Sequence, residues 1–333
     1  MTQSCRYPHI SWKKGFKRDT VSTLLSSHNK AILFHTGRDL LNEHVENPDI
    51  LWNEPEALRI LRAQQADGSW RYPGGNDSIR SQKNYNQLET YRNLRVLVEK
   101  YGFYRTHHSI EEAVGFLFGF QTDEGDFRGI YGSQYTPNYS AAIMEILVKA
   151  GYGKDKRIQK GLEWLLSVRQ DDGGWAIPIR TRGEKLDIIT ARHKGAPIQP
   201  DRYKPSAHLV TGIVLRAFAS HPVYRNCIEA RKAGDLLKSR FFRKDSYPDH
   251  VSENYWYKFG YPFWWTDLIS SLDSLSKLGF ERDDADIARG LKWFVNNQMK
   301  NGMWKVKYGN PKDPDMEQWV ALAACRVFKT FYS

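Results

Sequence analysis

The chain has 333 residues, of which 41% are hydrophobic and 26% are charged, a balance typical of globular proteins. Its mean hydropathy of -0.62 and the lack of any apolar run long enough to span a membrane argue against an integral membrane protein. The net charge of +11 favours an anionic partner. Nucleic acid is not the favoured one, because the basic residues are spread along the chain and no nucleic-acid-binding motif is present.

The N-terminal residues are basic but lack the apolar stretch of a signal peptide. This predicts a cytoplasmic protein, whose only membrane contact would be peripheral. We expect a basic segment at residues 1–18 and one domain at residues 19–333. The three cysteines, Cys5, Cys227 and Cys325, are far apart, which fits a reducing compartment and offers no thiolate metal site.

After a predicted helix at about residues 19–46, the chain repeats a unit of helix, turn and helix. In four copies the turn holds a Gln, two or more polar residues, a Gly and then an aromatic residue. These turns run from Gln65 to Trp70, from Gln121 to Phe127, from Gln170 to Trp175 and from Gln298 to Trp304. A fifth copy is degraded, with Arg240, Asp245 and Tyr247 in place of the Gln, the Gly and the aromatic residue.

Each turn joins two helices whose apolar residues recur at helical spacing, and its Gly can adopt the left-handed conformation that ends a helix. The second helices are predicted to begin near Gln87, Asn138, Ser206, Trp265 and Glu317. Because one such unit cannot bury its apolar face alone, the units must stack, and a curved stack can close on itself. The sequence therefore predicts a single all-α domain, an (α/α) barrel of five to six helical hairpins.

The Gln-to-Trp turns resemble the QW motifs of the terpene cyclase and prenyltransferase superfamily, which includes squalene–hopene cyclases and the beta subunits of protein prenyltransferases. The resemblance covers about residues 54–333. It implies an (α/α) toroid with the first helix of each unit outside and the second inside, and it implies an enzyme that handles isoprenoids. The motif is a structural brace, so it says more about the fold than about activity.

Two features of that superfamily are missing. Its class II cyclases use a DxDD aspartate as the acid, whereas the nearest string here, RDDAD at residues 282–286, opens an outer helix, where acidic residues cap. Its protein prenyltransferases hold zinc with an Asp, a Cys and a His, and none of the three cysteines starts an inner helix. The proton donor or the metal site would therefore need replacement residues.

The candidates for catalysis come from topology. If the second helices form the inner ring, their N-termini lie at one end of the cavity, where helix dipoles suit an anion. His208, Asp267 and Glu317 occupy such first turns. Either acid could donate a proton, and one His with two carboxylates could hold a divalent metal such as Mg²⁺ or Zn²⁺. Each residue could equally be an ordinary helix-start residue.

Aromatic and basic side chains are the candidate ligand-binding groups. The run from Tyr255 to Trp265 leads into an inner helix, and its rings could stabilise a carbocation, stack on a sugar or simply pack. The loop from Pro178 to Pro205 is rich in Arg and Lys that could clamp a diphosphate or face solvent. The predicted ligand-binding residues are Glu89, Tyr91, Tyr139, Tyr255, Trp256, Trp264, Trp265, Trp319, Arg180, Arg182, Arg192, Arg202 and Lys204.

Three functions fit these features. The first is an isoprenoid-handling enzyme that binds an apolar or diphosphate-bearing small molecule in an aromatic cavity. The second is a polysaccharide lyase or glycoside hydrolase, since (α/α) toroids also carry these enzymes. The third is a noncatalytic binding or scaffold toroid. A deep apolar cavity would favour the first, an open polar groove the second, and an interior filled with side chains the third.

Overall fold

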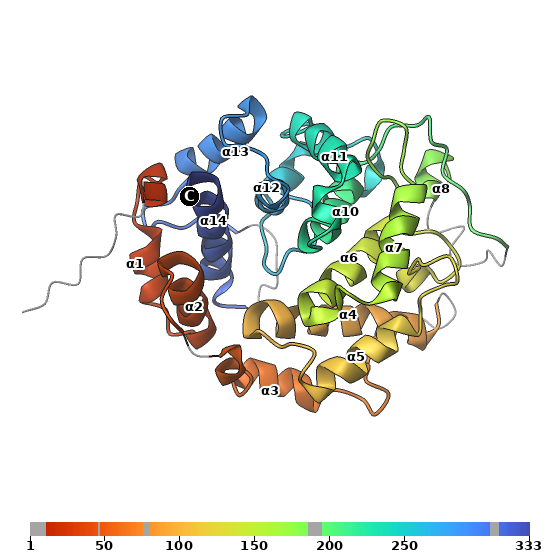
Figure 1. The fold of residues 1–333 in the computed structure, drawn as a ribbon, viewed down its shortest axis with the longest axis horizontal. Helices are drawn as coiled ribbons and strands as arrows, with labels where there is room; N and C mark the ends of the chain where they lie inside the picture. Colours follow the sequence, from red (N-terminus) through yellow and green to blue (C-terminus); the bar gives the residue numbers. More distant parts are fainter. Residues whose placement is uncertain (1–10, 46, 76–79, 186–194, 307–312) are drawn as a thin grey trace, which may run out of the picture.

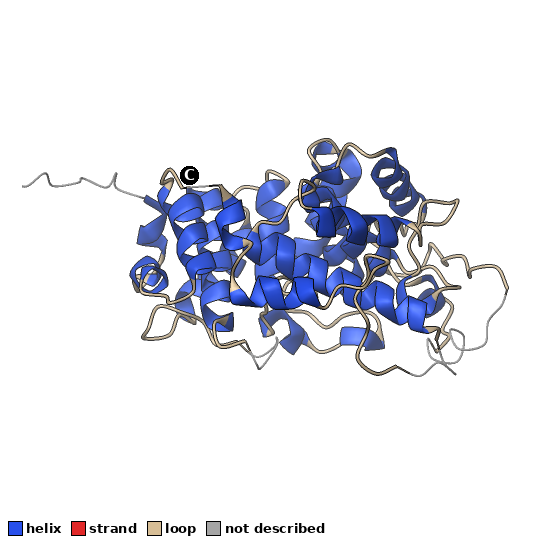
Figure 2. Cartoon of the chain, turned by 90° about the horizontal axis from the view of Figure 1, so that it is seen from below, coloured by secondary structure: helices blue, strands red, loops and turns tan. Residues whose placement is uncertain are grey.

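The computed structural model describes residues 11–45, 47–75, 80–185, 195–306 and 313–333. Within these ranges the secondary structure is helical, with connecting loops and no β-strand (Figure 2). The helices form a ring with an outer and an inner layer, as Figure 1 shows. The predicted all-α toroid is therefore confirmed.

The outer helices bury one stripe of their surface. In α7, for example, Ile158, Leu162 and Leu165 are fully buried, while most of the intervening residues face solvent. The caps are side-chain oxygens: Asp155 accepts a hydrogen bond from a first-turn N–H of α7, and Asp284 does so at α13. The outer layer consists of α3 (Pro55–Arg62), α5 (His108–Phe118), α7 (Lys156–Ser167), α11 (Ile228–Ser239) and α13 (Ala285–Asn296).

The inner helices are buried on nearly all sides. In α10 every residue from His208 to Ala219 is buried, because outer helices cover one face and other inner helices the rest. Neighbouring inner helices contact one another in chain order around the ring. The inner layer consists of α4 (Gln82–Tyr101), α6 (Pro137–Leu147), α10 (His208–Ser220), α12 (Leu268–Lys277) and α14 (Met316–Tyr332).

The prediction of one long N-terminal helix is wrong, but shorter helices do occupy the predicted range. It is divided into α1 (Thr20–Leu25), α2 (Lys30–His35) and a π-helical turn (Thr36–Leu41), because Asn29 starts a new helix by accepting hydrogen bonds from two backbone N–H groups. Helix α2 contacts both α14 and α4, so it closes the inner ring. Residues 11–15 also pack on α14, with Trp12 buried.

The connections contain several short elements. They are 3-10 turns at Ser11–Gly15, Pro48–Leu51, Gly129–Tyr131, Tyr224–Asn226, Pro248–His250 and Glu253–Tyr257, a π-helical turn at Val148–Tyr152, and the one-turn helix α8 (Pro178–Thr181).

The aromatic residues of the repeated turns tie each outer helix to its own hairpin. The indole N–H groups of Trp70, Trp175 and Trp304 each donate to a carbonyl ten residues earlier on the preceding outer helix, at 2.6–2.8 Å. In the first three turns the backbone N–H of the aromatic residue donates to a hydroxyl on the following inner helix, at 2.9–3.0 Å. The first and third turns therefore join the two layers of their own units through both bonds.

The glutamines of the first two turns join their units to the next, whereas Gln170 of the third turn donates to the carbonyls of Asp201 and Lys204 within its own unit. In the first turn the glutamine is Gln64, one position before the predicted Gln65: its Nε2 donates to the carbonyl of Ser109 in α5 at 2.8 Å. Gln121 makes the same contact with the carbonyl of Arg157 in α7, also at 2.8 Å. Gln65 is exposed, and its side chain accepts hydrogen bonds only from Ser69 and from Asn86 of α4, both within its own unit. The prediction was wrong by one residue because two glutamines are adjacent.

The last turn closes the ring onto the N-terminal helices. Gln298 accepts a hydrogen bond from the backbone N–H of Arg18 at 2.9 Å and donates to Oγ1 of Thr20 at 2.9 Å. Thr20 in turn donates to the carbonyl of Gly302 at 2.8 Å. A glutamine contact like those between neighbouring units therefore also joins the last unit to the N-terminal helices.

The adjacent glutamines allow a direct test of this bracing. We expect Gln64→Ala to lower the free energy of unfolding by about 1–2 kcal/mol, because two backbone carbonyls lose their donor. Gln65→Ala should cost less than about 0.5 kcal/mol, as is usual for an exposed side chain. Urea unfolding followed by tryptophan fluorescence measures both. Equal losses in the two variants would contradict the assignment.

Candidate active site in the ring interior

One stretch of chain, Tyr261–Trp265, lies across the interior of the ring; we call it the crossing segment. At one end the ring of Tyr261 stacks on Trp319 of α14, with 5.5 Å between centroids. Farther along, the carbonyl of Phe263 accepts a hydrogen bond from Arg95 of α4 at 2.8 Å. The contacts come from helices on different sides of the ring, so part of the interior is occupied by the chain itself.

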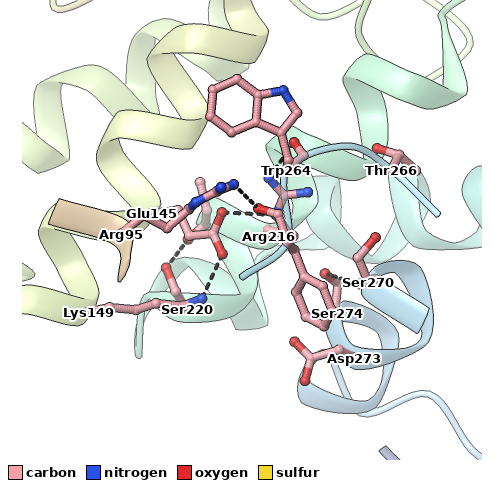
Figure 3. A network of polar contacts seen from close by, with 12 residues as sticks. Arg95, Glu145, Lys149, Arg216, Ser220, Trp264, Thr266, Ser270, Asp273 and Ser274 are labelled. Carbon is pink, nitrogen blue, oxygen red and sulfur yellow. Dashed lines mark hydrogen bonds and ion pairs between the residues drawn. The ribbon is translucent and has the colours of Figure 1, made fainter. Parts of the chain in front are cut away.

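A buried ion-pair network holds the other end of the crossing segment (Figure 3). Arg216 of α10 donates to the carbonyls of Trp265 and Trp264, at 3.1 and 3.4 Å, and its Nε lies 2.9 Å from a carboxylate oxygen of Glu145 on α6. The second oxygen of Glu145 lies 2.7 Å from Nζ of Lys149. Burial alone would raise the pKa of Glu145, but Lys149 and Arg216 together lower it, so the carboxylate stays ionised.

Predicted ligand-binding residues gather around Trp264. The ring of Tyr91 lies 5.5 Å from that of Trp264, and Trp265 lies 5.7 Å from it on the other side. The guanidinium groups of Arg92 and Arg95 lie over the Trp264 ring, at 5.1 and 4.6 Å from its centroid. We call these five residues, together with Tyr139, the aromatic cluster.

Tyr139 lies at the edge of the aromatic cluster, and Glu89 lies beside it. Burial raises the pKa of Tyr139, which also interacts electrostatically with Tyr131, Arg92 and Tyr91, so its hydroxyl keeps its proton. Glu89 lies 3.3 Å from Arg92 and partly neutralises it. The structure therefore brings Glu89, Tyr91, Tyr139, Trp264 and Trp265 into one region at the N-terminal half of the inner helices.

The other predicted aromatic residues lie outside this region. Tyr255 lies 3.9 Å from His250, and Trp256 lies 4.6 Å from His208, where both rings help to pack the loop that leads to the crossing segment. Trp319 is fully buried under Tyr261. Trp319 therefore supports the crossing segment from α14.

The three predicted catalytic residues do not form a metal site. His208 is buried and lies 3.5 Å from Asp245 of the degraded turn, whose carboxylate caps α10 through two backbone N–H groups. Asp267 caps α12, and Glu317 lies in the first turn of α14. Within the described ranges, no three His, Cys, Asp or Glu side chains lie together in a way that could hold a metal ion.

Asp267 is the most strongly perturbed acid of the three. It is 3% exposed, and burial raises its pKa to about 7, against the hydrogen bonds of Ser270 and the charge of Arg216. Its Oδ1 accepts the backbone N–H of Ser270 at 2.8 Å, and Ser270 Oγ accepts the backbone N–H of Asp267 at 3.0 Å, which completes a capping box. A buried acid with such a pKa is partly protonated near neutral pH.

The predicted basic clamp is largely neutralised. Arg180 forms a two-pronged ion pair with Asp249, at 2.7 and 3.0 Å, and Arg202 lies 3.4 Å from Asp171. Arg180, Arg182 and Lys204 line an open pocket of about 520 Å³ on the outside of the ring. Arg192 lies outside the described residues. The ion-pair partners of Arg180, Arg182 and Arg202 are Asp249, Asp201 and Asp171, none of which belongs to the aromatic cluster.

A second pocket, of about 380 Å³, opens at the C-terminal ends of the inner helices, the end opposite to the predicted one. Its wall is charged and includes Arg38, Asp39, Glu99, Lys149 and Arg326. These groups pair with one another: Arg326 lies 2.5 Å from Asp39, and Lys149 lies 2.8 Å from Glu99. Cations at these helix ends also offset the negative ends of the helix dipoles.

Sequence reasoning missed the residues that hold the interior together, above all Glu145, Arg216, Arg95 and Lys149. A signal was present, because Glu145 and Arg216 stand alone among apolar residues in predicted inner helices. A charge in such a position must be paired when it is buried. The partner could not be named, since the pairs join different repeats.

Comparisons with known proteins show what this chain is similar to. No family model matches it. It is 26% identical to the squalene–hopene cyclase of Bradyrhizobium diazoefficiens over 158 residues, which are 46% of this chain and 21% of that protein. It is 23% identical to a probable squalene–hopene cyclase of Sinorhizobium fredii over 133 residues, 40% of this chain and 20% of that protein. The matched part thus spans about a fifth of these relatives.

Solved structures were compared in the same way. The type II terpene cyclase MstE from Scytonema, in complex with geranylgeranyl dihydroxybenzoate, matches 85% of this chain and 97% of its own, with a TM-score of 0.40 and 13% identity. An ent-copalyl diphosphate synthase from Streptomyces platensis matches 81% of this chain and 49% of its own, with a TM-score of 0.38 and 13% identity.

The chain is thus similar to members of the terpene cyclase superfamily, as its repeated turns led us to expect. None of the helices in the described part of the chain is long and apolar enough to cross a membrane.

The pKa of Asp267 predicts a pH dependence of stability. The unfolded side chain titrates near pH 3.9, below the folded value of about 7, so the folded protein gains stability from this proton at low pH and loses it as the pH rises through 7. Asp267→Asn removes the titration but keeps a capping oxygen. From pH 5 to pH 8 the difference in unfolding free energy should move by about 2–3 kcal/mol in favour of the variant.

Urea unfolding at the two pH values measures this shift. Asp284→Asn, which alters the cap of the outer helix α13, is the matched control, because the pKa of Asp284 is lowered and its carboxyl does not titrate in this range. If the unfolding free energies of wild type and Asp267→Asn depend on pH in the same way, the carboxyl group of Asp267 does not hold a proton in the folded protein.

The ion-pair network predicts a second stability effect. Arg216→Met leaves Glu145 with one cation and two carbonyls of the crossing segment without a donor, so we expect a loss of about 3–5 kcal/mol. Arg182→Met, at an arginine that is about half exposed, should change stability by less than about 1 kcal/mol. Chemical unfolding measures both, and a small effect at Arg216 would mean that the crossing segment is held by packing instead.

Proposed function

We propose that this chain handles an isoprenoid ligand in the manner of a terpene cyclase, with the aromatic cluster as the binding surface and Asp267 as the proton donor. The observation that carries the proposal is the link between the two through Arg216. Arg216 binds the carbonyls of Trp264 and Trp265 and interacts electrostatically with both Asp267 and Tyr91. The similarity to squalene–hopene cyclases supports this choice of ligand class.

The chemistry of the cluster suits a protonated alkene. An acid must hold its proton before it can donate it to an alkene, and burial keeps Asp267 partly protonated near neutral pH, while the raised pKa also makes it a weaker donor than an ordinary carboxylic acid. The cation that forms would be attracted to the aromatic faces of the cluster through their quadrupoles, where it would compete with Arg92 and Arg95, which already lie over the Trp264 ring. The charge of Arg216, which would oppose such a cation, is offset by the ionised Glu145.

A metal has no part in this proposal, because His208, Asp267 and Glu317 do not lie together. A reaction that begins by ionising a diphosphate would need cations free to receive it. Arg92 is paired with Glu89, and Arg95 donates to the crossing segment. Protonation of a double bond is therefore the reaction type that these residues favour.

A noncatalytic binding toroid is the second candidate, and one observation favours it. The crossing segment occupies part of the interior and is held by Arg95, Arg216 and the contact of Tyr261 with Arg326. In that function the aromatic cluster would bind a ligand without turnover, and Asp267 would serve only as a helix cap.

Incubation with a panel of ligands distinguishes these functions. The panel holds squalene-like polyenes, prenyl diphosphates and acidic oligosaccharides, with products identified by mass spectrometry. We expect conversion of a polyene or prenyl substrate, and a loss of about 10²–10⁴-fold in Asp267→Asn because the acid is gone. The control Asp155→Asn, which alters an exposed cap of an outer helix, should keep wild-type turnover.

Binding of an isoprenoid without conversion would favour the noncatalytic toroid. Cleavage of an oligosaccharide would overturn the proposal in favour of the carbohydrate-active alternative. Full turnover by Asp267→Asn would remove that residue from the site while leaving the ligand class in place.

A further inference from the structure

Arg80 is a cation without an acidic partner. It lies just before α4, at the N-terminal end of the inner layer, and is half-buried. Its guanidinium group lies over the ring of Tyr131, 4.9 Å from the centroid, and it forms no ion pair within the described ranges. Its Nε is buried and has no hydrogen-bond partner in the same part of the chain. A charged donor in this position calls for an explanation, because leaving it unpaired costs free energy.

Aromatic contacts connect Arg80 with the aromatic cluster. The ring of Tyr131 lies 6.0 Å from the ring of Tyr139, edge to face. Arg80 and Arg92 both interact electrostatically with the hydroxyl group of Tyr139. Two guanidinium groups, one from the connection before α4 and one from α4 itself, therefore act on the same hydroxyl group.

Arg92 has hydrogen-bond donors to spare. Its guanidinium group lies over the rings of Tyr72 and Trp264, at 5.3 and 5.1 Å from their centroids. Among the described residues it donates one hydrogen bond, from Nη1 to Glu89 at 3.3 Å. A guanidinium group has five N–H donors, so most of them remain available. The Arg92 side chain is 39% exposed, and a ligand can therefore reach it from solvent.

Positive charge exceeds negative charge in this region. Arg80, Arg92 and Arg95 all lie over aromatic rings, and in the described part of the chain Glu89 is the one carboxylate that pairs with any of them. Three cations and one carboxylate leave an excess of two positive charges. The ion pairs deeper in the ring balance one another and do not cancel this excess. The N-terminal ends of α4 and α6 add partial positive charge.

We propose that Arg80, Arg92 and Tyr139 form a binding site for a phosphate or diphosphate head group of the ligand. The inference rests on the proposed function, because the chain of that ligand would lie on the aromatic cluster. A phosphate group carries a charge of about −1.5 to −2, which matches the excess better than a single carboxylate does. Its oxygens accept hydrogen bonds, and the two guanidinium groups and the Tyr139 hydroxyl can donate them.

This site agrees with a reaction that begins by protonation. Binding a head group that stays on its chain asks less of the cations than expelling it, because a leaving diphosphate gains negative charge that must be stabilised. Arg80 and the spare donors of Arg92 can hold such a group while Arg95 keeps its hydrogen bond to the crossing segment. Head-group binding and the proposed role of Asp267 therefore use different residues.

Binding to the wild-type protein tests the inference with four probes. Quenching of tryptophan fluorescence gives the affinities for farnesyl diphosphate, farnesoic acid and farnesol, and isothermal titration calorimetry gives the affinity for inorganic pyrophosphate. Farnesyl diphosphate should bind about tenfold or more tightly than farnesol or farnesoic acid, since hydrogen bonds to charged groups are worth this much.

Equal binding of farnesol or farnesoic acid overturns the head-group site but leaves the isoprenoid function standing. Pyrophosphate binding without binding of any farnesyl compound supports the anion site and overturns the isoprenoid function. If none of the four probes binds, both fail.

Arg80→Met gives the second readout. The variant should lose about tenfold or more in affinity for farnesyl diphosphate and keep its affinity for farnesol. Its melting temperature should stay near that of wild type, because Arg80 forms no ion pair among the described residues. Tyr139→Phe, which keeps the ring and removes one donor, should also weaken binding of the diphosphate more than binding of farnesol.

Arg71→Met is the matched control. Arg71 is an exposed arginine on the same connection between α3 and α4, so its loss changes the net charge by the same amount and should leave both affinities unchanged. Equal losses in Arg80→Met and Arg71→Met would mean that only the net charge matters. That result, or unchanged diphosphate affinity in Arg80→Met, overturns the site.

Discussion

The pairing of Arg216 with Glu145 is the interaction on which the interior depends. Both residues sit on inner helices that are buried on nearly every side, where neither charge would be tolerated alone. Once paired, Arg216 has donors left for the two carbonyls of the crossing segment, and so it fixes where Trp264 and Trp265 lie. The position of the aromatic cluster therefore follows from an ion pair between two repeats.

This dependence explains how far the sequence could lead. The ring itself was predictable, because the repeat carries its own signal: a Gln, a left-handed Gly and an aromatic residue within six or seven residues, followed by a helix. Gln64 and Gln121 show why the pattern recurs, since each reaches the next outer helix. The choice between Gln64 and Gln65 could not be made, because the bracing contact lies 45 residues away in the chain.

The site was predictable only in part. Tyr91 and Tyr139 lie in the N-terminal halves of α4 and α6, and Trp264 lies just before α12, but their role in ligand binding stays a prediction. Topology could not show that His208 turns toward Asp245 of a degraded turn, or that the cations of the basic loop are paired with acids from other units. Such contacts depend on how far each helix is rotated about its axis, and hydrophobic spacing does not determine that angle closely enough.

The interior combines two kinds of environment. The part toward the C-terminal half of the inner helices is a network of paired charges, in which few charged groups lack a partner. The part at the N-terminal half of these helices is aromatic and contains Asp267, whose pKa burial raises to about 7, and the amide of Gln87, which has no hydrogen-bond partner among the described residues. Charges that are all satisfied give rigidity, whereas polar atoms without partners are ready for a ligand. Successive turns of the same helices thus carry a rigid network of paired charges and, next to it, the proposed binding surface.

The hydrogen bonds of Gln298 have a consequence for how the protein opens. A linear solenoid has end repeats with a single neighbour, and it frays from them. In this ring the turn after the last outer helix, α13, is bonded to the start of α1, so every hairpin has two neighbours. A hairpin can then leave only if two interfaces break together. Amide hydrogen exchange should therefore be slow and nearly uniform among the outer helices, without the graded protection from end to middle that marks an open array.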